Sequence, residues 1–436
     1  MSRSGRNTRR LTATEIDLTV TRQLALVVGT ATNERSREEC DSSLEELVQL
    51  VDTAGADVVE RVVQSRERPH PATYVGSGKA QEIKMLTQAL DVDVVVFDDE
   101  LAPNQQRNLE KILECDVVDR TALILDIFAQ HATTQEGMVQ VELAQLRYRM
   151  PRLSGRGLQL SQQGGGIGTR GPGETLHEVD RRRIRTRMAQ LERELDRLAR
   201  TRSNQRKARQ RSRIPVVALV GYTNAGKSTL LNRITAADVY VENRLFSTLD
   251  PTTRKLSLPG GQMVLCSDTV GFLRRLPHQL VEAFRSTLEE VAAADLLIHV
   301  VDASAPDAPA QIEAVHRVLK EIGADTVPEL RVINKIDIAN PDQIRQIQTF
   351  DSLCVSAYRD EGIEKFVSAI GDKLRSLGEI LEYLVPYERG DVIASLHRDG
   401  EVLVEVHSDV GTRVRVRLDA AQHPRYSEFI ADPAAS

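Results

Sequence analysis

The residues from Gly221 to Ser228 have the types and the spacing of a loop that binds phosphate groups. They read GYTNAGKS, with the two glycines five positions apart and a lysine and a serine directly after the second glycine. Glycines let backbone N–H groups close around phosphates, Lys227 adds a positive charge, and the Ser228 hydroxyl can bind Mg²⁺. The apolar run IPVVALV precedes the loop, so a strand, a loop and a helix are predicted. The motif predicts binding of a nucleoside triphosphate without separating ATP from GTP.

A second motif, NKID at 334–337, indicates which base is bound. The carboxylate of Asp337 can accept hydrogen bonds from N1–H and the exocyclic amine of guanine, groups that adenine does not offer in that arrangement. Lys335 can lie over the base, and the segment CVSAY offers backbone groups at Ser356 and Ala357. NKxD alone is unspecific, but it follows the phosphate loop by about 107 residues with a DxxG motif between them. The combination predicts GTP.

The DxxG motif and a threonine-rich segment are the predicted sensors of the terminal phosphate. Asp268 closes the run QMVLCSD and is expected to hold Mg²⁺ through water, while the Gly271 amide is expected to bond the γ-phosphate. The next position helps the attacking water in many GTPases, yet it holds Phe272, whose ring can neither orient nor deprotonate water. In the predicted first switch, FSTLDPTTRK (246–255), spacing alone does not choose among Thr248, Thr252 and Thr253.

The elements that position these residues belong to a chain of 436 residues, enough for about three domains. With 41% hydrophobic and 28% charged residues it has the composition of a globular protein. Five segments are predicted: a disordered tail (1–20), an N-terminal α/β domain (21–132), a coiled-coil hairpin with a glycine-rich tip (133–213), a Ras-like P-loop α/β core (214–378) and a small C-terminal α+β domain (379–436).

In the N-terminal segment, the apolar runs LALVVG (24–29) and VDVVVFDD (92–99) predict buried parallel strands. Helices are predicted at SLEELVQLVDTAG (43–55) and PNQQRNLEKIL (103–113). The sequence VGSGK (75–79) resembles the end of a second phosphate-loop motif. That motif would require glycine at position 73, five positions before Gly78, and the residue there is threonine. A tight turn before a helix is the interpretation that we prefer.

Two stretches around residue 160 carry apolar residues at heptad spacing, which predicts an antiparallel coiled-coil hairpin. The first helix is expected to stop at Pro151 and the second to run from about Leu176 to Arg209. The apolar positions are Val139, Leu143, Leu146 and Met150 in the first helix, and Ile184, Met188, Leu191, Leu195 and Leu198 in the second.

The hairpin carries most of the positive charge of an acidic chain. Residues 152–213 hold 17 Lys and Arg against 6 Asp and Glu, whereas the whole chain has a net charge of −6. Arg152, Arg156 and Arg170 lie in the glycine-rich tip, so contact with RNA is predicted. The alternative is a solvated charged helix pair. A G-x-G-x-x-G match in the tip (Gly166, Gly168, Gly171) follows no strand, which argues against a dinucleotide site.

Other features place the chain by cellular compartment. The cysteines Cys40, Cys115, Cys266 and Cys354 have neither metal-ligand nor redox spacing, so reduced thiols in the cytoplasm are expected. We find no apolar run long enough to span a membrane and no signal peptide in the basic N-terminus. After residue 379 the stretch IASLHRDGEVLVEVHSDVGTRVRVRL has a strand-like pattern.

The motifs GYTNAGKS, FSTLD, DTVGFL, NKID and SAY occur in the order found in translation-factor-related GTPases. Together with LSGRG…GGGIGTRGPGE and DRTALILDIFAQHA, the segment FSTLDPTTR resembles the HflX family of bacterial GTPases, over residues 20–380 or so. The resemblance implies a GTPase that binds the large ribosomal subunit and dissociates or rescues stalled ribosomes under stress. It also implies that Thr248 is the Mg²⁺-binding threonine, and that a hydrophobic residue such as Phe272 is normal at its position.

The predicted site therefore contains catalytic residues, nucleotide-binding residues and Mg²⁺ ligands. The catalytic residues are Lys227, Thr248 and Gly271, and the Mg²⁺ ligands are Ser228 and Thr248. The residues expected to bind GTP or GDP are Gly221, Tyr222, Thr223, Asn224, Ala225, Gly226, Lys227, Ser228, Thr229, Phe246, Ser247, Thr248, Leu249, Asp250, Asp268, Thr269, Val270, Gly271, Asn334, Lys335, Ile336, Asp337, Ser356, Ala357 and Tyr358.

We expect a monomeric GTP hydrolase that is slow alone and is stimulated by ribosomes, which it contacts through the basic hairpin. One alternative is a GTP-dependent switch that acts on a non-ribosomal protein or a tRNA-modification partner. The other is a structural RNA-binding protein whose nucleotide site only stabilises the fold.

Overall fold

The structure is a computed structural model that describes residues 22–33, 35–153, 176–212, 214–235, 245–246, 252–259, 261–275, 288, 290–418 and 422–431. The predicted disordered tail and most of the glycine-rich tip, with Arg156 and Arg170, lie outside these residues. Arg152 was predicted in the tip, but it is the last residue of a helix. The chain divides into two compact units, one up to Asp126 and one from Ile127 onward, and each is described here by itself.

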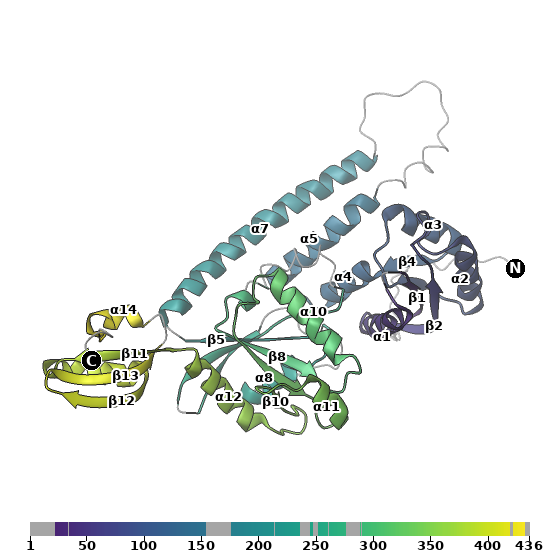
Figure 1. The fold of residues 1–436 in the computed structure, drawn as a ribbon. Helices are drawn as coiled ribbons and strands as arrows, with labels where there is room; N and C mark the ends of the chain where they lie inside the picture. Colours follow the sequence, from purple (N-terminus) through teal and green to yellow (C-terminus); the bar gives the residue numbers. More distant parts are fainter. Residues whose placement is uncertain are drawn as a thin grey trace, which may run out of the picture. The chain divides into compact units, whose positions relative to one another are not determined.

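The first unit is built on a parallel sheet of four strands in the order β2-β1-β3-β4. Apolar residues of β1, β3 and the helices make its core, among them Leu26, Val95 and Leu109. Its elements are β1 (Gln23–Ala31), α1 (Arg37–Thr53), β2 (Ala56–Ser65), α2 (Ser77–Ala89), β3 (Val94–Phe97), α3 (Pro103–Leu113) and β4 (Asp116–Asp119), followed by α4 (Arg120–His131), which continues into the second unit (Figure 1).

The structure confirms the predicted strands at 24–29 and 92–99 and the helix at 103–113, which is α3. The turn interpretation of VGSGK is also confirmed, since Gly76 caps α2 and the helix begins at Ser77. The sequence pattern did not predict β2 or β4. Both are edge strands, and only Val62 of β2 is buried while β4 has two valines between aspartates, so neither has the continuous apolar run of a central strand.

A network of buried ion pairs and hydrogen bonds lies at the carboxyl end of β3. Arg35 contacts the Asp98 carboxylate, Arg120 Nη1 donates to it at 2.6 Å, and the Ser43 hydroxyl donates at 2.7 Å. Arg120 also reaches Glu46 at 2.6 Å. Burial alone would raise the pKa of Asp98, but the two guanidinium groups outweigh it and hold that pKa below its usual value. The network therefore joins the loop between β1 and α1, helix α1, the residue after β3 and helix α4.

In the second unit, α5 (Gln135–Arg152) and α7 (Leu176–Ser212) run antiparallel, and their predicted pairing is seen (Figure 1). Val139, Leu143 and Leu191 are buried between them, with Leu146, Met188 and Leu195 partly buried beside them. Ion pairs flank this seam, since Arg187 donates twice to Glu142 at 2.7 Å and Arg147 reaches Glu192 at 2.9 Å. The prediction that Pro151 stops the first helix is wrong by one residue, because the helix ends at Arg152.

The central sheet of the second unit has six strands in the order β10-β9-β8-β5-β7-β6, all parallel except β6, which pairs antiparallel with β7. This is the mixed α/β arrangement predicted for a P-loop core. The strands are β5 (Val216–Gly221), β6 (Thr252–Ser257), β7 (Met263–Asp268), β8 (Leu296–Asp302), β9 (Glu329–Asn334) and β10 (Leu353–Cys354), and the helices are α8 (Lys227–Thr235), α10 (Ala308–Glu321), α11 (Pro341–Ile347) and α12 (Ile363–Ser376) (Figure 1).

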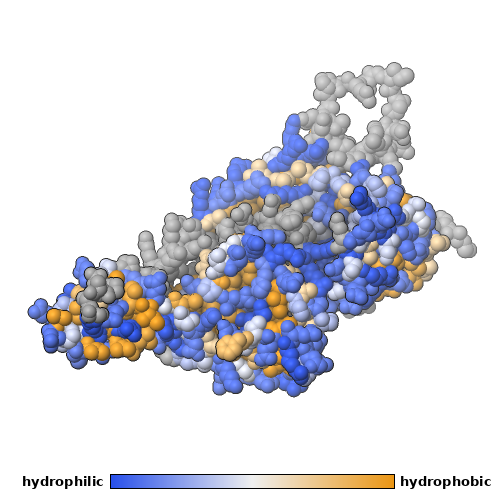
Figure 2. Space-filling model, viewed as in Figure 1, coloured by the Kyte–Doolittle hydropathy of each residue, from blue (hydrophilic) through white to orange (hydrophobic). Residues whose placement is uncertain are grey.

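The C-terminal part is a small α+β fold around an antiparallel sheet of order β11-β13-β12, as predicted. The strand-like interpretation of the stretch from Ile393 is wrong at its start, because Ile393 to Asp399 lie in a helix that buries Val392 and Leu396. The elements are β11 (Glu379–Val385), α13 (Gly390–Asp399), β12 (Glu401–Ser408), β13 (Gly411–Leu418) and α14 (His423–Tyr426). Figure 2 shows apolar residues on the surface of this part, where Val404 and Val406 are exposed.

The structure describes the cysteines and the helices, on which two of the predictions from the sequence depend. The four cysteines, all within the described residues, are free thiols. In the described parts of the chain, no helix is both long and apolar enough to cross a membrane.

Candidate nucleotide-binding site

The phosphate loop joins β5 to α8, at the carboxyl edge of the parallel sheet. Asn224 and Gly226 both have left-handed backbone angles, with φ of +60° and +93°. A Cβ at Gly226 would lie 2.3 Å from Asn334 Nδ2, so only glycine fits there. Successive backbone N–H groups in such a loop, followed by a helix N-terminus, form a cradle for phosphate oxygens.

Lys227 supplies the positive charge of this cradle. Its ammonium is buried and donates to the carbonyl oxygens of Gly221 at 3.1 Å and Tyr222 at 2.9 Å. Burial disfavours the charged form and lowers the pKa of Lys227 to about 8, although Asp268 offsets part of the effect. A buried cation held by two neutral carbonyl groups fits an anionic ligand, because phosphate oxygens would supply the missing negative charge.

Ser228 and Asp268 form the oxygen cluster expected for Mg²⁺. The Ser228 hydroxyl donates to Asp268 Oδ2 at 2.5 Å, and Asp268 is only 2% exposed at the end of β7. A hydroxyl and a carboxylate beside a phosphate cradle fit Mg²⁺, which prefers oxygen ligands and keeps several waters. When bound, Mg²⁺ neutralises charge on the phosphates. Thr248, the other predicted Mg²⁺ ligand besides Ser228, lies outside the described residues, and Thr252 and Thr253 lie in β6.

The DxxG segment is joined to the phosphate loop through its backbone. The Phe272 N–H donates to the Gly221 carbonyl at 3.1 Å, and the Thr223 N–H donates to the Phe272 carbonyl at 2.8 Å. A Cβ on Gly271 would lie 2.7 Å from the Thr223 Cα, so this glycine permits the close approach. The Phe272 ring is 1% exposed, so it packs in the core of the domain.

The segments predicted to bind guanine meet at Asn334, which is 2% exposed. Its side-chain amide donates to the Ala225 carbonyl at 2.9 Å, and its oxygen accepts the Ala357 N–H at 3.1 Å. One side chain therefore ties the phosphate loop to the two base-binding loops. Asp337 accepts the Ser356 hydroxyl at 2.7 Å, which fixes its carboxylate in position.

Lys335, the second residue of NKxD, has φ of +62° and its ammonium lies 2.8 Å from Asp302 at the end of β8. Asp302 was not predicted, although its position at the carboxyl end of an apolar strand was a usable signal. Arg233 of α8 was also missed. It donates to the carbonyl oxygens of Ala357 at 3.0 Å and Tyr358 at 3.2 Å, and so supports the base-binding loop.

The structure thus brings together the predicted residues of the phosphate loop, DxxG, NKxD and SAY segments that it describes. Three predicted positions have less to do with a ligand. The Phe246 ring packs edge-on against Phe128 of α4, with ring centroids 4.6 Å apart, and Tyr358 is 81% exposed. The Thr269 hydroxyl donates to the Leu219 carbonyl at 2.7 Å, inside the core. Ser247, Thr248, Leu249 and Asp250 lie outside the described residues.

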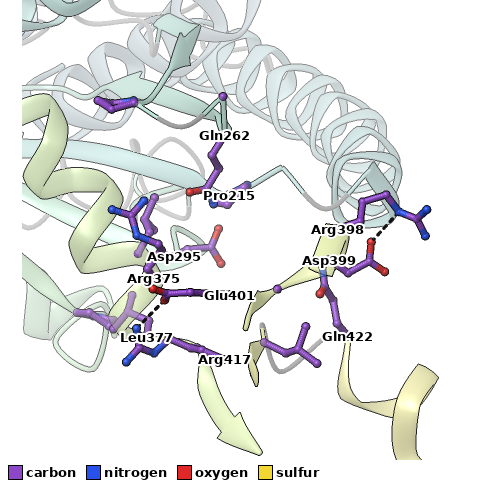
Figure 3. Close-up of a pocket in the computed structure, with 17 residues that line it drawn as sticks. Pro215, Gln262, Asp295, Arg375, Leu377, Arg398, Asp399, Glu401, Arg417 and Gln422 are labelled. Atoms are coloured by element: carbon purple, nitrogen blue, oxygen red, sulfur yellow. Dashed lines mark hydrogen bonds and ion pairs between the residues drawn. The ribbon is translucent and has the colours of Figure 1, made fainter. Parts of the chain in front are cut away.

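A separate pocket of about 720 Å³ opens at the other edge of the sheet (Figure 3). It is lined by Pro215, Asp295 and Pro328, which precede β5, β8 and β9, and by residues of the C-terminal part. Among its charged groups, Arg417 pairs with Glu401 at 2.8 Å and Arg398 lies 3.4 Å from Asp399. None of the predicted nucleotide-binding residues lines it, so this pocket is not the nucleotide site.

Comparison with known proteins yields three family matches along the chain. Residues 41–129 match "GTP-binding GTPase N-terminal", residues 131–209 match "GTP-binding GTPase Middle Region", and residues 216–335 match "50S ribosome-binding GTPase".

Individual relatives match over most of their length. The chain is 48% identical over 395 residues to GTPase HflX of Caldanaerobacter subterraneus subsp. tengcongensis, covering 91% of this chain and 92% of that protein. It is 46% identical over 344 residues to GTPase HflX of Escherichia coli (strain K12), covering 78% and 80%. Among solved structures, a complex of SsGBP with GDP is 26% identical with a TM-score of 0.47, covering 82% of this chain and 99% of that one.

Proposed function

Because this chain belongs to the HflX family of GTPases, we propose that its GTP hydrolysis is coupled to the large ribosomal subunit and serves to dissociate or rescue stalled ribosomes. The chain binds guanine nucleotide and hydrolyses GTP. The proposal adds the partner, the use of Mg²⁺ through Ser228, Asp268 and Thr248, a monomeric state and a cytoplasmic location. The family matched by residues 216–335 is described as a 50S ribosome-binding GTPase, which supports this choice of partner.

The observation that carries the proposal is the arginine-rich surface of α7. The run Arg181-Arg182-Arg183 is followed by Arg185, and the side chains of Arg182, Arg183 and Arg185 are exposed. The described part of α7 is largely hydrophilic in Figure 2. Such a surface favours a phosphate backbone, since arginine pairs with phosphate in two-point contacts and stacks on bases. Ribosomal RNA provides both features.

Arg187 differs from these arginines. Its guanidinium is engaged by Glu142 on α5 through two hydrogen bonds of 2.7 Å, which hold the helix pair together. Glu142 keeps a lowered pKa through this contact. Neutralising Arg187 would therefore disturb the helix pair as well as any RNA contact, so it is a poor test of binding.

The first experiment measures ribosome binding as a function of salt. The variant Arg183→Gln/Arg185→Gln should bind large subunits more weakly, with the slope of log K against log salt concentration smaller by about 1.5, because about two phosphate contacts are lost. Arg317→Gln/Lys320→Gln, which removes two exposed charges from α10, is the matched control and should bind like the parent. Equal slopes for the parent and the α7 variant would contradict RNA contact through α7.

The second experiment addresses hydrolysis. With the Phe272 ring buried, no side chain at that position can help the attacking water, and GTPases without a donated group turn over at only about 10⁻⁴ s⁻¹. We expect steady-state hydrolysis to rise when purified large subunits are added. Stimulation of less than about twofold would refute a ribosome-supplied group, since donated groups add about 10³- to 10⁵-fold. Stimulation by another protein or by tRNA alone would favour the regulatory-switch alternative.

The third experiment tests the glycine-rich tip by its consequence for ribosomes. Deleting residues 164–168 should leave GTP binding and much of the ribosome affinity intact, yet abolish splitting of ribosomes as followed by light scattering. If the deletion variant splits ribosomes at the parent's rate, the helix pair is only an anchor.

A further inference from the structure

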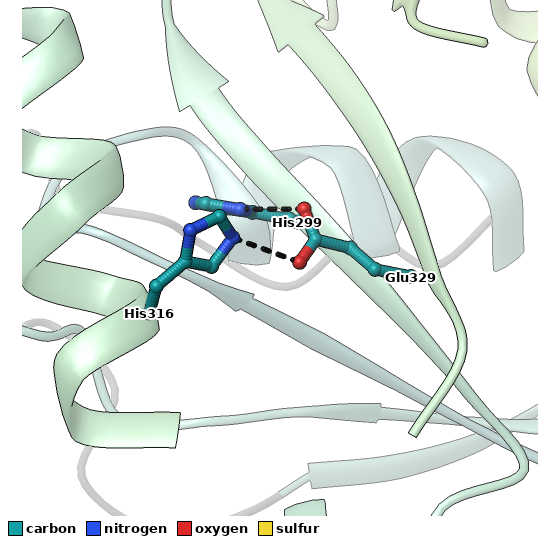
Figure 4. Close-up of side chains that lie close together, drawn as sticks. All are labelled: His299, His316 and Glu329. Carbon is teal, nitrogen blue, oxygen red and sulfur yellow. Dashed lines mark hydrogen bonds and ion pairs between the residues drawn. The ribbon is translucent and has the colours of Figure 1, made fainter. Parts of the chain in front are cut away.

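Three side chains that no nucleotide motif includes converge beneath α10. His299 of β8, His316 of α10 and Glu329 of β9 point toward one another (Figure 4). His299 Nδ1 lies 3.0 Å from Glu329 Oε1, and His316 Nε2 lies 3.0 Å from Glu329 Oε2. The nitrogen and oxygen atoms that could bind a metal all lie within 4.8 Å of one another. We call this cluster the His299–His316–Glu329 triad.

The fold places the triad through the registers of two strands and one helix. Glu329 is paired with Leu297, two residues before His299, so His299 and Glu329 lie on the same face of the sheet. On that face Val301 and Ile333 pack against Ile312 of α10. His316 is four residues after Ile312, on the next turn of the same helix face. The polar triad therefore lies next to the apolar residues that pack α10 against the sheet.

Burial makes this set of groups unlike a surface cluster. The His299 side chain is 1% exposed and that of Glu329 is 25% exposed, while His316 is 44% exposed and leaves one side open to water. The neutral imidazole is the form that binds a metal ion.

Two imidazole nitrogens and one carboxylate, with an open position, are a donor set typical of Zn²⁺ sites that retain a water ligand. We infer that the His299–His316–Glu329 triad binds Zn²⁺ or a similar transition-metal ion. Mg²⁺, the ion of the nucleotide site, prefers oxygen ligands and would not choose two imidazoles. The ion would replace the two ring N–H···carboxylate hydrogen bonds, and each neutral ring would then carry its single proton on its other nitrogen.

The site would act as a clip within the sheet and not as a catalytic centre. The strands that carry His299 and Glu329 end at Asp302 and Asn334, which belong to the nucleotide site at the far end of both strands. An ion bound to the triad would link β8, β9 and α10 and stabilise the domain without touching the nucleotide.

One neighbouring charge opposes the ion. Arg331 Nε lies 3.9 Å from Glu329 Oε1 on the same face of the sheet, and a guanidinium repels a divalent cation. Removing the charge of Arg331 should therefore tighten binding of the metal, whereas removing a ligand should weaken it.

The experiment uses full-length protein with Mg²⁺ and GDP, stripped of other metals with a chelator and then titrated with Zn²⁺ in competition with a chromophoric chelator. The parent should bind one Zn²⁺ per chain with micromolar or tighter affinity and should melt at a higher temperature with the ion. His316→Ala should weaken this binding at least tenfold, or about 1.4 kcal/mol. Arg331→Gln should bind Zn²⁺ more tightly than the parent.

The matched control is His397→Ala, because His397 also lies 3.0 Å from a glutamate, Glu405, but is not part of a triad. It should bind Zn²⁺ like the parent. His316 is half-exposed, so its loss should leave GDP affinity unchanged, which verifies the fold of each variant. Absence of micromolar Zn²⁺ binding by the parent, or equal binding by His316→Ala and the parent, would show that the triad is only a hydrogen-bonded network.

Discussion

We expect selection of guanine to depend on the carboxylate of Asp337, and Asp337→Asn tests this expectation directly. The side chain is 8% exposed, with one oxygen accepting the Ser356 hydroxyl at 2.7 Å and the other 3.8 Å from Arg359 Nε. In Asp337→Asn one acceptor becomes an NH₂ donor, which would face the N1–H and amine donors of guanine.

The magnitude follows from these contacts. Losing a hydrogen bond to a charged group costs about 1.5–3 kcal/mol, and leaving a buried donor unpaired costs about 1–3 kcal/mol more. Their sum, about 2.5–6 kcal/mol, corresponds to a rise of about 10²- to 10⁴-fold in the Kd for GTP. Xanthosine triphosphate has an oxygen where guanine has the amine, so the variant should bind it more tightly than the parent does.

The assay is displacement of a fluorescent GDP analogue by each triphosphate. Ser356→Ala is the matched control, since it removes the hydroxyl that positions Asp337 but keeps the carboxylate. It should weaken GTP less and gain nothing for xanthosine triphosphate. If Asp337→Asn binds GTP within about threefold of the parent, a difference of less than 1 kcal/mol, Asp337 does not read the base.

Three further predictions concern the loops and the N-terminal sheet. Asn334→Ala leaves the Ala225 carbonyl and the Ala357 N–H without their partner and should lower the free energy of unfolding by about 2–4 kcal/mol in urea titrations; a loss below about 0.5 kcal/mol would contradict the bridging role. Gly226→Ala should abolish GTP binding measured by titration, because its Cβ would meet Asn334, whereas Gly78→Ala in α2, where space is open, should bind normally and be slightly more stable. The third concerns acid: because the folded-state pKa of Asp98 is lowered, its ionised form stabilises the fold above the unfolded pKa of about 3.9, and this contribution is lost as pH falls through the lower folded value. Asp98→Asn should therefore flatten the decline of unfolding free energy below about pH 4, and an unchanged decline would rule out this carboxylate as its source.

The nucleotide site could be predicted from the sequence because each part carries its chemistry in neighbouring residues. GYTNAGKS and NKID specify both the side chains and the backbone that presents them, so Lys227 and Asp337 could be proposed as nucleotide-binding residues from the sequence. The contacts that join these parts could not be predicted from the sequence. Arg233 supports carbonyl groups 124 and 125 positions away, and no local pattern marks that pairing.

The same reason explains why the His299–His316–Glu329 triad escaped sequence analysis. Its members come from β8, α10 and β9, with 30 positions between the histidine and the glutamate that pair across the strands. Metal motifs are recognisable when ligands share one helix or one turn, whereas these ligands meet only after the sheet and helix have packed.

The prediction of secondary structure was wrong where the strand propensity of the residues differed from the element that they form. In the C-terminal part, Ile393 and Leu396 belong to a helix that covers one face of the sheet, although β-branched and apolar residues around them are typical of strands. The heptad positions of α5 and α7 were predicted because one apolar seam has to meet another.

The short connection between α7 and β5 has a mechanical consequence. Helix α7 ends at Ser212 and β5 begins at Val216, so three residues separate a helix of 37 residues from the strand that ends in the phosphate loop. The strand is fastened at once, since the Leu265 N–H donates to the Pro215 carbonyl at 2.8 Å and the Val216 N–H donates to Asp295 at 2.7 Å. A connection of three residues allows little independent movement of the two elements. A force along α7 would therefore act directly on the start of β5.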